Sequence, residues 1–303
     1  TGVSVSNFAI LFPGQGSQSV GMLADLASRF DDVQKKFTIA SRILGYDLWD
    51  LVQNGPEDQL NQTAFTQPAL LVADVAVWTC WRQKNNETPS FLAGHSLGEY
   101  AALVCTEVLS FEDAIALVAL RGEAMQSAVK TGKGAMAAIV GLDDDVVLAV
   151  CKAAGGVVSP ANYNSIGQVV IAGETSAVEK AMTLAQEKGA KLVKKIPVSV
   201  PSHCALMQPA ADMMAKKLKT VTMKAPIIPV IQNAEAVAYQ SPEKIRDALI
   251  QQLTSPVRWV ATIQKIMQQG VSLFFECGPG NVLAGLNKRI SKEIVTKCLF
   301  ADS

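Results

Sequence analysis

Residues 94–100 read Gly-His-Ser-Leu-Gly-Glu-Tyr, which places Ser96 between two glycines directly after the apolar run 91–93. A Gly-x-Ser-x-Gly sequence between a strand and a helix is typical of a nucleophile elbow, a sharp turn that exposes a serine hydroxyl. The following segment, 99–104, favours a helix whose first N–H groups point back at that serine. The motif therefore predicts that Ser96 is a covalent nucleophile.

A serine hydroxyl is a weak nucleophile at neutral pH and needs an adjacent base. The chain has only two histidines, His95 and His203. Because neighbouring side chains diverge in an elbow, we expect His95 to be structural. His203, in the segment Val-Pro-Ser-His-Cys at 200–204, is therefore the expected general base.

The third member of a catalytic triad is harder to find. In α/β-hydrolases the order is Ser, then an acid, then a His near the C-terminus, whereas His203 lies in mid-chain and no Asp or Glu stands out. A carbonyl from the backbone or from an amide side chain also holds an imidazole N–H. We expect a Ser–His dyad assisted by an amide carbonyl.

The loop Gly14-Gln15-Gly16 follows the apolar run 9–12, which reads as a buried parallel strand. Glycines allow close backbone approach, and the carboxyl ends of parallel strands are where such sheets bind ligands. An ordinary tight turn would explain the same residues. We expect an oxyanion hole formed by the backbone N–H groups of Gln15 and Leu97.

Arg121 lies in the strongly apolar helical run 117–122, with Met125 on the same helix face at i+4. Arginine is seldom buried without a partner, and its fork matches a carboxylate. One interpretation is an acyl pocket for a substrate that carries a carboxylate, lined by Met125. A salt bridge to an acid such as Glu99 explains Arg121 equally well.

These residues need a scaffold, and the alternation of short apolar strands with longer helices predicts an α/β domain with a mostly parallel sheet. Helices are predicted over 69–81, opened by Thr-Gln-Pro at 66–68, and over 204–220, 242–253, 257–269 and 281–291. From 134 to 198 the order is βαββαβ, a ferredoxin-like arrangement. We predict a discontinuous, hydrolase-like catalytic domain (1–130 and 199–303) with a ferredoxin-like subdomain inserted at 131–198.

The composition is that of a globular protein, with 49% hydrophobic and 18% charged residues. Lys and Arg number 27, as do Asp and Glu, so no basic excess favours nucleic acid or a membrane surface. No apolar stretch approaches a membrane span, and the N-terminus has no secretory signal pattern. The six scattered cysteines are typical of reduced thiols, and we expect a cytoplasmic protein.

Taken together, the sequence resembles the malonyl-CoA:acyl-carrier-protein transacylases of bacterial type II fatty acid synthesis, over essentially the whole chain. The Val-Pro-Ser-His segment is similar to the freestanding malonyl enzymes rather than to methylmalonyl-selecting domains. The resemblance rests on seven separate segments: 11–18, 66–69, 94–100, 162–165, 200–204, 255–259 and 276–280.

The resemblance implies Ser96 as nucleophile, His203 as base, Gln15 and Leu97 as oxyanion donors, and Arg121 as clamp for the malonyl carboxylate. It also implies that a glutamine carbonyl orients the histidine; this residue falls on Gln252, although Gln251 is adjacent. Asn162 and Met125 are implied as further substrate-binding residues.

The implied reaction is ping-pong malonyl transfer from malonyl-CoA to acyl carrier protein, in fatty acid biosynthesis. The protein itself would need no metal or cofactor, because the partner carries the phosphopantetheine, and we expect a monomer. Carrier proteins are acidic, so a basic patch is expected near the entrance. The candidates are Lys191, Lys194, Lys195, Lys288 and Arg289.

Other functions remain open at this stage. A serine esterase or thioesterase would use the same elbow, and an acyltransferase could prefer another acyl group. A binding module that merely retains the fold is a third possibility. The absence of a clear acid and the mid-chain position of His203 disfavour the hydrolases.

Overall fold

The computed structural model describes residues 7–198 and 200–300. Its larger sheet is parallel except for the last strand, which is antiparallel to its neighbour. The strands lie in the order β10 (Val295–Cys298), β9 (Leu273–Glu276), β1 (Phe8–Phe12), β2 (Phe91–Gly94), β7 (Val230–Gln232) and β8 (Val237–Ala238).

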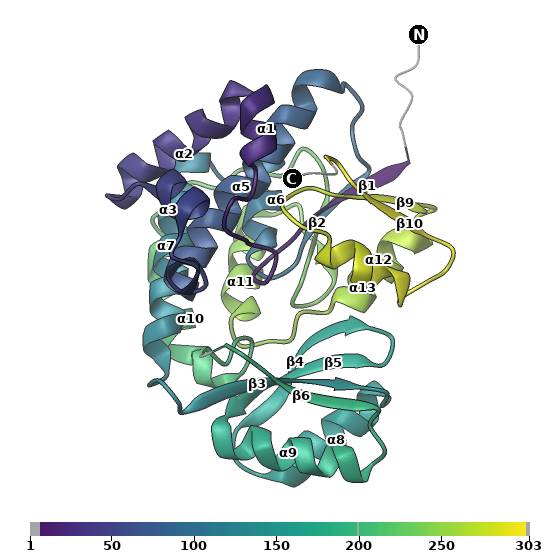
Figure 1. The fold of residues 1–303 in the computed structure, drawn as a ribbon. Helices are drawn as coiled ribbons and strands as arrows, with labels where there is room; N and C mark the ends of the chain where they lie inside the picture. The colour runs from purple at the N-terminus through teal and green to yellow at the C-terminus, as the bar shows by residue number, and fades with distance from the viewer. Residues whose placement is uncertain (1–6, 199, 301–303) are drawn as a thin grey trace.

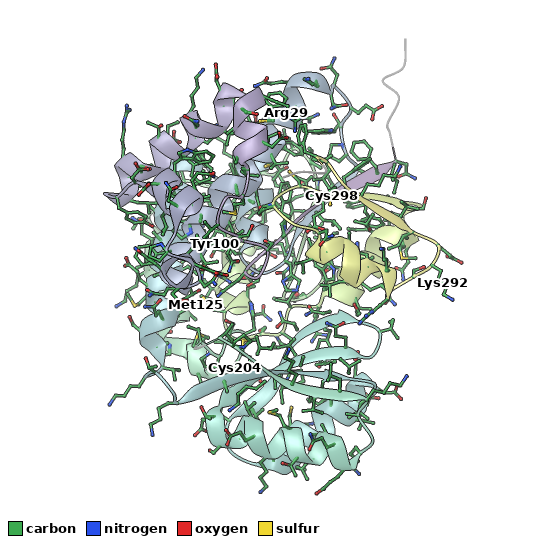
Figure 2. All side chains as sticks on the ribbon, viewed as in Figure 1. Arg29, Tyr100, Met125, Cys204, Lys292 and Cys298 are labelled. Atoms are coloured by element: carbon green, nitrogen blue, oxygen red, sulfur yellow. The ribbon has the colours of Figure 1, made fainter. Side chains whose placement is uncertain are left out.

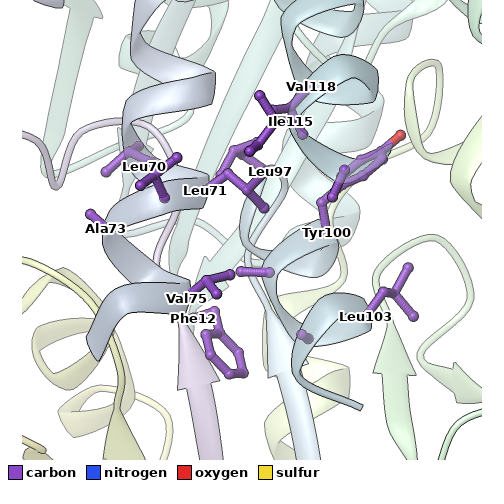
Figure 3. Close-up of a cluster of buried hydrophobic side chains, with 14 of the residues drawn as sticks. Phe12, Leu70, Leu71, Ala73, Val75, Leu97, Tyr100, Leu103, Ile115 and Val118 are labelled. Atoms are coloured by element: carbon purple, nitrogen blue, oxygen red, sulfur yellow. The ribbon is translucent and has the colours of Figure 1, made fainter. Parts of the chain in front are cut away.

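The central strand β1 is buried on both faces, as a continuous apolar run predicts for a parallel sheet. Phe8, Ile10 and Phe12 point into one core, and Ala9 and Leu11 into a second core on the opposite face. Figure 3 shows Phe12 among the helix side chains of the first core. The two faces of the sheet are therefore covered by separate layers of helices.

The first core is built on most of the helices of the large domain (Figure 1). These are α1 (Ala24–Arg29), α2 (Asp31–Leu44), α3 (Leu48–Asn54), α4 (Glu57–Leu60), α5 (Thr63–Lys84), α6 (Gly98–Cys105), α7 (Phe111–Ala128), α10 (Gln208–Leu218) and α11 (Pro242–Gln252). The opposite face is covered by α12 (Trp259–Gln268) and α13 (Val282–Lys288). None of the helices within 7–198 and 200–300 is long and apolar enough to cross a membrane.

A second, wholly antiparallel sheet lies below the first in Figure 1, with two helices on its outer face. It comprises β3 (Gly134–Val140), α8 (Asp144–Ala154), β4 (Val158–Ser165), β5 (Gln168–Glu174), α9 (Thr175–Glu187) and β6 (Leu192–Ile196). The strand order β4-β5-β3-β6 confirms the predicted ferredoxin-like arrangement. The domain boundaries at 131 and 198 stay a prediction.

Strand β4 fastens the second sheet to the large domain. The Tyr163 N–H donates to the Val257 carbonyl, and the Val257 N–H donates to the Ala161 carbonyl. The Ser165 hydroxyl donates to the carbonyl of Leu286 in α13. This pairing also explains why the helix predicted over 257–269 begins only at Trp259: Val257 is engaged in strand-like bonding.

Several predicted boundaries were wrong. Helix α5 begins at Thr63 and passes through Pro68, because the N–H groups of Phe65 and Thr66 already bond to the Gln62 carbonyl. Pro68 is inside the helix, where its missing N–H removes one intrahelical hydrogen bond. The helix predicted over 204–220 is a 3₁₀ turn, Ala205–Met207, followed by α10, and the one predicted over 281–291 is the shorter α13. The short strands β8 and β10 were not predicted.

Candidate active site

The candidate site lies at the carboxyl ends of β1 and β2, where parallel neighbours bring two loops together. The loops pack so closely that side chains would not fit. A Cβ on Gly98 would lie 2.1 Å from the Phe12 carbonyl oxygen, and one on Gly14 would lie 2.3 Å from that of His95. The glycines of both motifs therefore permit the contact between the loop after β1 and the elbow after β2.

Ser96 occupies the turn between β2 and α6 with φ of +54°, a left-handed conformation that non-glycine residues rarely adopt. Its Oγ lies 2.8 Å from Nε2 of His203. His203 also has a positive φ, +61°, in the segment that leads into the 3₁₀ turn. The structure thus brings together the two residues that the sequence predicted as nucleophile and base.

The other ring nitrogen of His203, Nδ1, lies 2.8 Å from the main-chain carbonyl oxygen of Gln252, the last residue of α11. A carbonyl only accepts, so Nδ1 carries the proton and Nε2 is free to accept from the Ser96 hydroxyl. Burial, followed by the charge of Arg121, lowers the pKa of His203 to about 3. The imidazole is therefore a neutral base at pH 7.

The side chain of Gln252 has a different role from its backbone. Its Oε1 accepts from the Arg121 guanidinium at 2.9 Å, and its Nε2 donates to the Ser96 carbonyl at 3.0 Å. The predicted orienting carbonyl is thus the main-chain one. The amide fixes the cation and the elbow relative to each other.

Arg121 is 1% exposed and donates to Gln67 Oε1 at 2.8 Å and to Ser96 Oγ at 3.3 Å. The ion pairs of the described residues are Arg29–Asp25 and Lys195–Glu179, so within this part of the chain no carboxylate pairs with Arg121. The salt bridge to Glu99, which the sequence left open, is not formed. Arg121 is instead held by neutral amides and lies over the Tyr100 ring.

The expected oxyanion donors lie in the two loops that meet at the site. Among the described residues, the backbone N–H groups of Gln15 and Leu97 have no hydrogen-bond acceptor. Leu97 is the N-cap of α6, so its N–H belongs to the positive end of that helix. Both groups are available to an oxygen beside Ser96.

A cavity of about 650 Å³ opens above Ser96, between the large domain and the second sheet. Asn162 on β4 and His95 line it, and His95 Nε2 lies 2.8 Å from Asn164 Oδ1 rather than at the nucleophile. Met125 is buried on α7 and contacts Gln67 through its sulfur; Figure 2 shows it in the large domain. Asn162 thus faces the cavity, whereas Met125 packs behind it.

Sequence reasoning missed two side chains of this network. Gln67, in the Thr-Gln-Pro segment, bonds to Arg121, and Asn233 bonds to the Ser96 backbone. The signal for Gln67 was a polar residue in the segment that opens an apolar helix; the signal for Asn233 was an amide two residues after the largely apolar run 227–231. Neither pattern is specific enough to assign a role.

A family model described as "Acyl transferase domain" matches residues 9–298. The chain belongs to this family. The assignment is in accord with the elbow, because a serine nucleophile can carry an acyl group as a covalent intermediate between donor and acceptor.

Relatives that match over nearly the whole chain indicate one kind of acyl transferase. The malonyl CoA-acyl carrier protein transacylase of Salmonella typhimurium is 51% identical over 97% of this chain and 96% of its own length. That of Haemophilus influenzae is 54% identical over 94% and 93%. The resemblance predicted from the seven segments is confirmed.

Solved structures agree. An acyl carrier protein S-malonyltransferase from Vibrio cholerae has a TM-score of 0.95 at 57% identity, covering 97% of this chain and 96% of that one. A malonyl-transacylase in complex with a type II PKS acyl-carrier protein has a TM-score of 0.96 at 53% identity, covering 98% and 97%.

Proposed function

We propose that this protein transfers a malonyl group from malonyl-CoA to the phosphopantetheine thiol of acyl carrier protein, through an O-malonyl-serine at Ser96. One observation carries the choice of acyl group: the buried Arg121 guanidinium donates to the nucleophile and pairs with no carboxylate of the described residues. In malonate a single methylene separates the reacting carbonyl from the free carboxylate. A carboxylate held by Arg121 therefore leaves the thioester carbonyl beside Ser96 Oγ.

In the first half-reaction His203 Nε2 takes the proton of Ser96 as Oγ bonds to the thioester carbon. The carbonyl oxygen becomes an oxyanion that accepts from the N–H groups of Gln15 and Leu97. When the tetrahedral intermediate collapses, the carbon–sulfur bond breaks. His203 returns its proton to the departing sulfur, so CoA leaves as a thiol and the ester remains on Ser96.

The second half-reaction runs the same steps with another thiol. His203 Nε2 takes the proton of the phosphopantetheine thiol, whose sulfur bonds to the ester carbon. The same N–H groups hold the oxyanion. Collapse breaks the carbon–oxygen bond, and His203 returns the proton to Ser96 Oγ. No acid beyond His203 is needed, because each proton that it takes is given back.

The carrier protein must approach the mouth of the cavity. The strand pairing of β6 shows on which face of the second sheet each lysine of this strand lies. Lys194 pairs opposite Ala138, on the sheet face of Met136 and Ile196, which line the cavity. The Lys195 side chain lies on the other face and pairs with Glu179 of α9 at 2.7 Å, although Lys195 is itself one of the residues that line the cavity. Lys194, with the exposed Lys288 and Arg289, is the better candidate for contact with an acidic partner.

Intact-protein mass spectrometry tests the proposal. After brief incubation with malonyl-CoA we expect one malonyl adduct, mapped to Ser96 by peptide digestion and missing in Ser96→Ala. Added holo acyl carrier protein should remove the adduct and gain its mass. Release of free malonate at the same rate without any thiol acceptor would instead identify a hydrolase.

A further inference from the structure

We propose that Asn233 is a positioning residue for the nucleophile, because its side chain bridges the backbone on both sides of the elbow. Asn233 directly follows β7, the neighbour of β2, so it lies at the same sheet edge as Ser96. Its Oδ1 accepts from the Ser96 N–H at 2.8 Å, and its Nδ2 donates to the Gly94 carbonyl at 2.6 Å. The inference rests on the proposed function of Ser96.

The elbow needs such a bridge because its backbone leaves the sheet. Ser96 has a positive φ, and a conformation of this kind persists only where the surroundings over-determine it. With no strand continuing from β2, the Gly94 carbonyl and the Ser96 N–H need another partner. Asn233, which is fully buried, satisfies one donor and one acceptor with a single planar amide.

Asn233 is itself held in place from three directions. Its N–H donates to Glu99 Oε1 at 2.6 Å, and its carbonyl accepts from the Arg258 N–H at 3.2 Å. Gln252 Nε2 also donates to Asn233 Oδ1, at 3.2 Å. Glu99 belongs to the first turn of α6, the helix that begins at the elbow. Glu99 of α6 therefore fixes the backbone of Asn233, and the Asn233 side chain in turn fixes the turn from which α6 begins.

The bridge sets the direction of Ser96 without touching the reacting atoms. Rotation of the Ser96 backbone would move Oγ away from Nε2 of His203, now 2.8 Å away, and would turn the Leu97 N–H. A displacement of about 1 Å is enough to lower a rate about 100-fold. Loss of the bridge should therefore slow acylation and leave the affinity for malonyl-CoA nearly unchanged.

Asn233→Asp is the sharpest probe. The Asp side chain keeps one oxygen for the Ser96 N–H, but its second oxygen replaces a donor that faces the Gly94 carbonyl. Protonated, that oxygen donates and restores the bridge; ionised, it repels the carbonyl. The ratio of variant to wild-type acylation rate should therefore fall as pH rises from 5 to 8, by about 100-fold at the upper end. The wild-type rate over the same pH range is the reference, because His203 and Glu99 lie close to the substituted residue.

Thr106→Val is the matched control. The Thr106 hydroxyl is buried and makes two hydrogen bonds to the backbone of Ile228, beyond the far end of α6. Thr106→Val removes two buried hydrogen bonds between a side chain and the backbone. Asn233→Ala removes the same number from the backbone of Gly94 and Ser96, but Thr106→Val leaves the elbow intact. We expect Asn233→Ala to lower kcat about 100-fold with KM within about twofold, and Thr106→Val to keep wild-type kcat.

If the Asn233 variants do not fold, variants of Glu99 test the proposal instead. Glu99→Gln keeps an oxygen for the Asn233 N–H and should retain kcat, whereas Glu99→Leu removes it and should lower kcat about tenfold. The proposal is overturned by a pH-independent rate ratio for Asn233→Asp, by a loss confined to KM, or by equal loss in Thr106→Val. Wild-type protein that forms no malonyl adduct would refute the proposed function instead.

Discussion

Replacement of Arg121 by Met should separate malonyl from acetyl transfer. Met has a similar length but no charge, so it removes the cation while filling much of its space. In the wild type the guanidinium is buried, and its hydrogen-bond partners among residues 7–198 and 200–300 are Gln67, Gln252 and Ser96. A malonyl carboxylate would supply the missing anion, whereas an acetyl group would leave the cation unpaired.

The magnitude follows from the burial of Arg121, which is 1% exposed. Removing one partner of a buried ion pair costs about 3–5 kcal/mol, and about 1.36 kcal/mol is tenfold in rate. Arg121→Met should therefore lower kcat/KM for Ser96 acylation by malonyl-CoA about 150- to 5,000-fold. Acetyl-CoA forms no such pair, so its much slower reaction should change by less than about tenfold, through the lost contact with Ser96 Oγ.

The assay is rapid-quench acylation with radiolabelled malonyl-CoA or acetyl-CoA, without carrier protein, so that only the first half-reaction is measured. The ratio of the two losses is the informative quantity, because the lost contact between Arg121 and Ser96 Oγ is common to both substrates. Equal losses for malonyl and acetyl groups would show that Arg121 supports the nucleophile and does not recognise the carboxylate.

Three further outcomes are expected. Burial and then Arg121 lower the pKa of His203 from 6.5 to about 3, so kcat/KM for acylation should stay level from pH 7 to 5; a break near 6.5 in a pH–rate profile would contradict this. Burial raises the pKa of Glu99 from 4.5 to about 8, so between these pH values the folded state keeps a proton that the unfolded chain releases. The stability that this proton contributes is fully present below pH 4.5 and is lost as pH rises through 8. Calorimetry should then show Tm of Glu99→Gln minus wild-type Tm increasing from pH 5 to 8, and a constant difference would refute the buried proton. Lys194→Glu should raise apparent KM for acyl carrier protein about fivefold, and Lys195→Glu less; equal effects would mean that the facing of β6 does not matter.

The main features of the site were predictable because they depend on local sequence. Ser96 needs a turn with small neighbours, and Gly94 and Gly98 indicate such a turn. Two histidines in the whole chain leave His203 as the base by elimination. The alternation of strands and helices placed the loop at Gln15 and the elbow at the same edge of a parallel sheet. These inferences need periodicity and residue type, and no knowledge of long-range packing.

The remainder depended on contacts that sequence spacing does not encode. The carbonyl that orients His203 belongs to the backbone of Gln252, and any residue type has a backbone carbonyl. Arg121 could have paired with Glu99; only the packing shows that Glu99 instead accepts from the Asn233 N–H. The start of α12 was misplaced because β4, almost a hundred residues earlier, captures Val257.

The charge of Arg121 connects substrate recognition to the strength of the base. Unpaired, the guanidinium disfavours a second positive charge nearby and so lowers the pKa of His203. A malonyl carboxylate that neutralises Arg121 removes this repulsion and allows His203 to accept the Ser96 proton more readily. An acetyl group cannot do so, and the base stays weak. We therefore expect Arg121 to discriminate in the chemical step as well as in binding, because a carboxylate bound to it would also remove the repulsion that weakens His203.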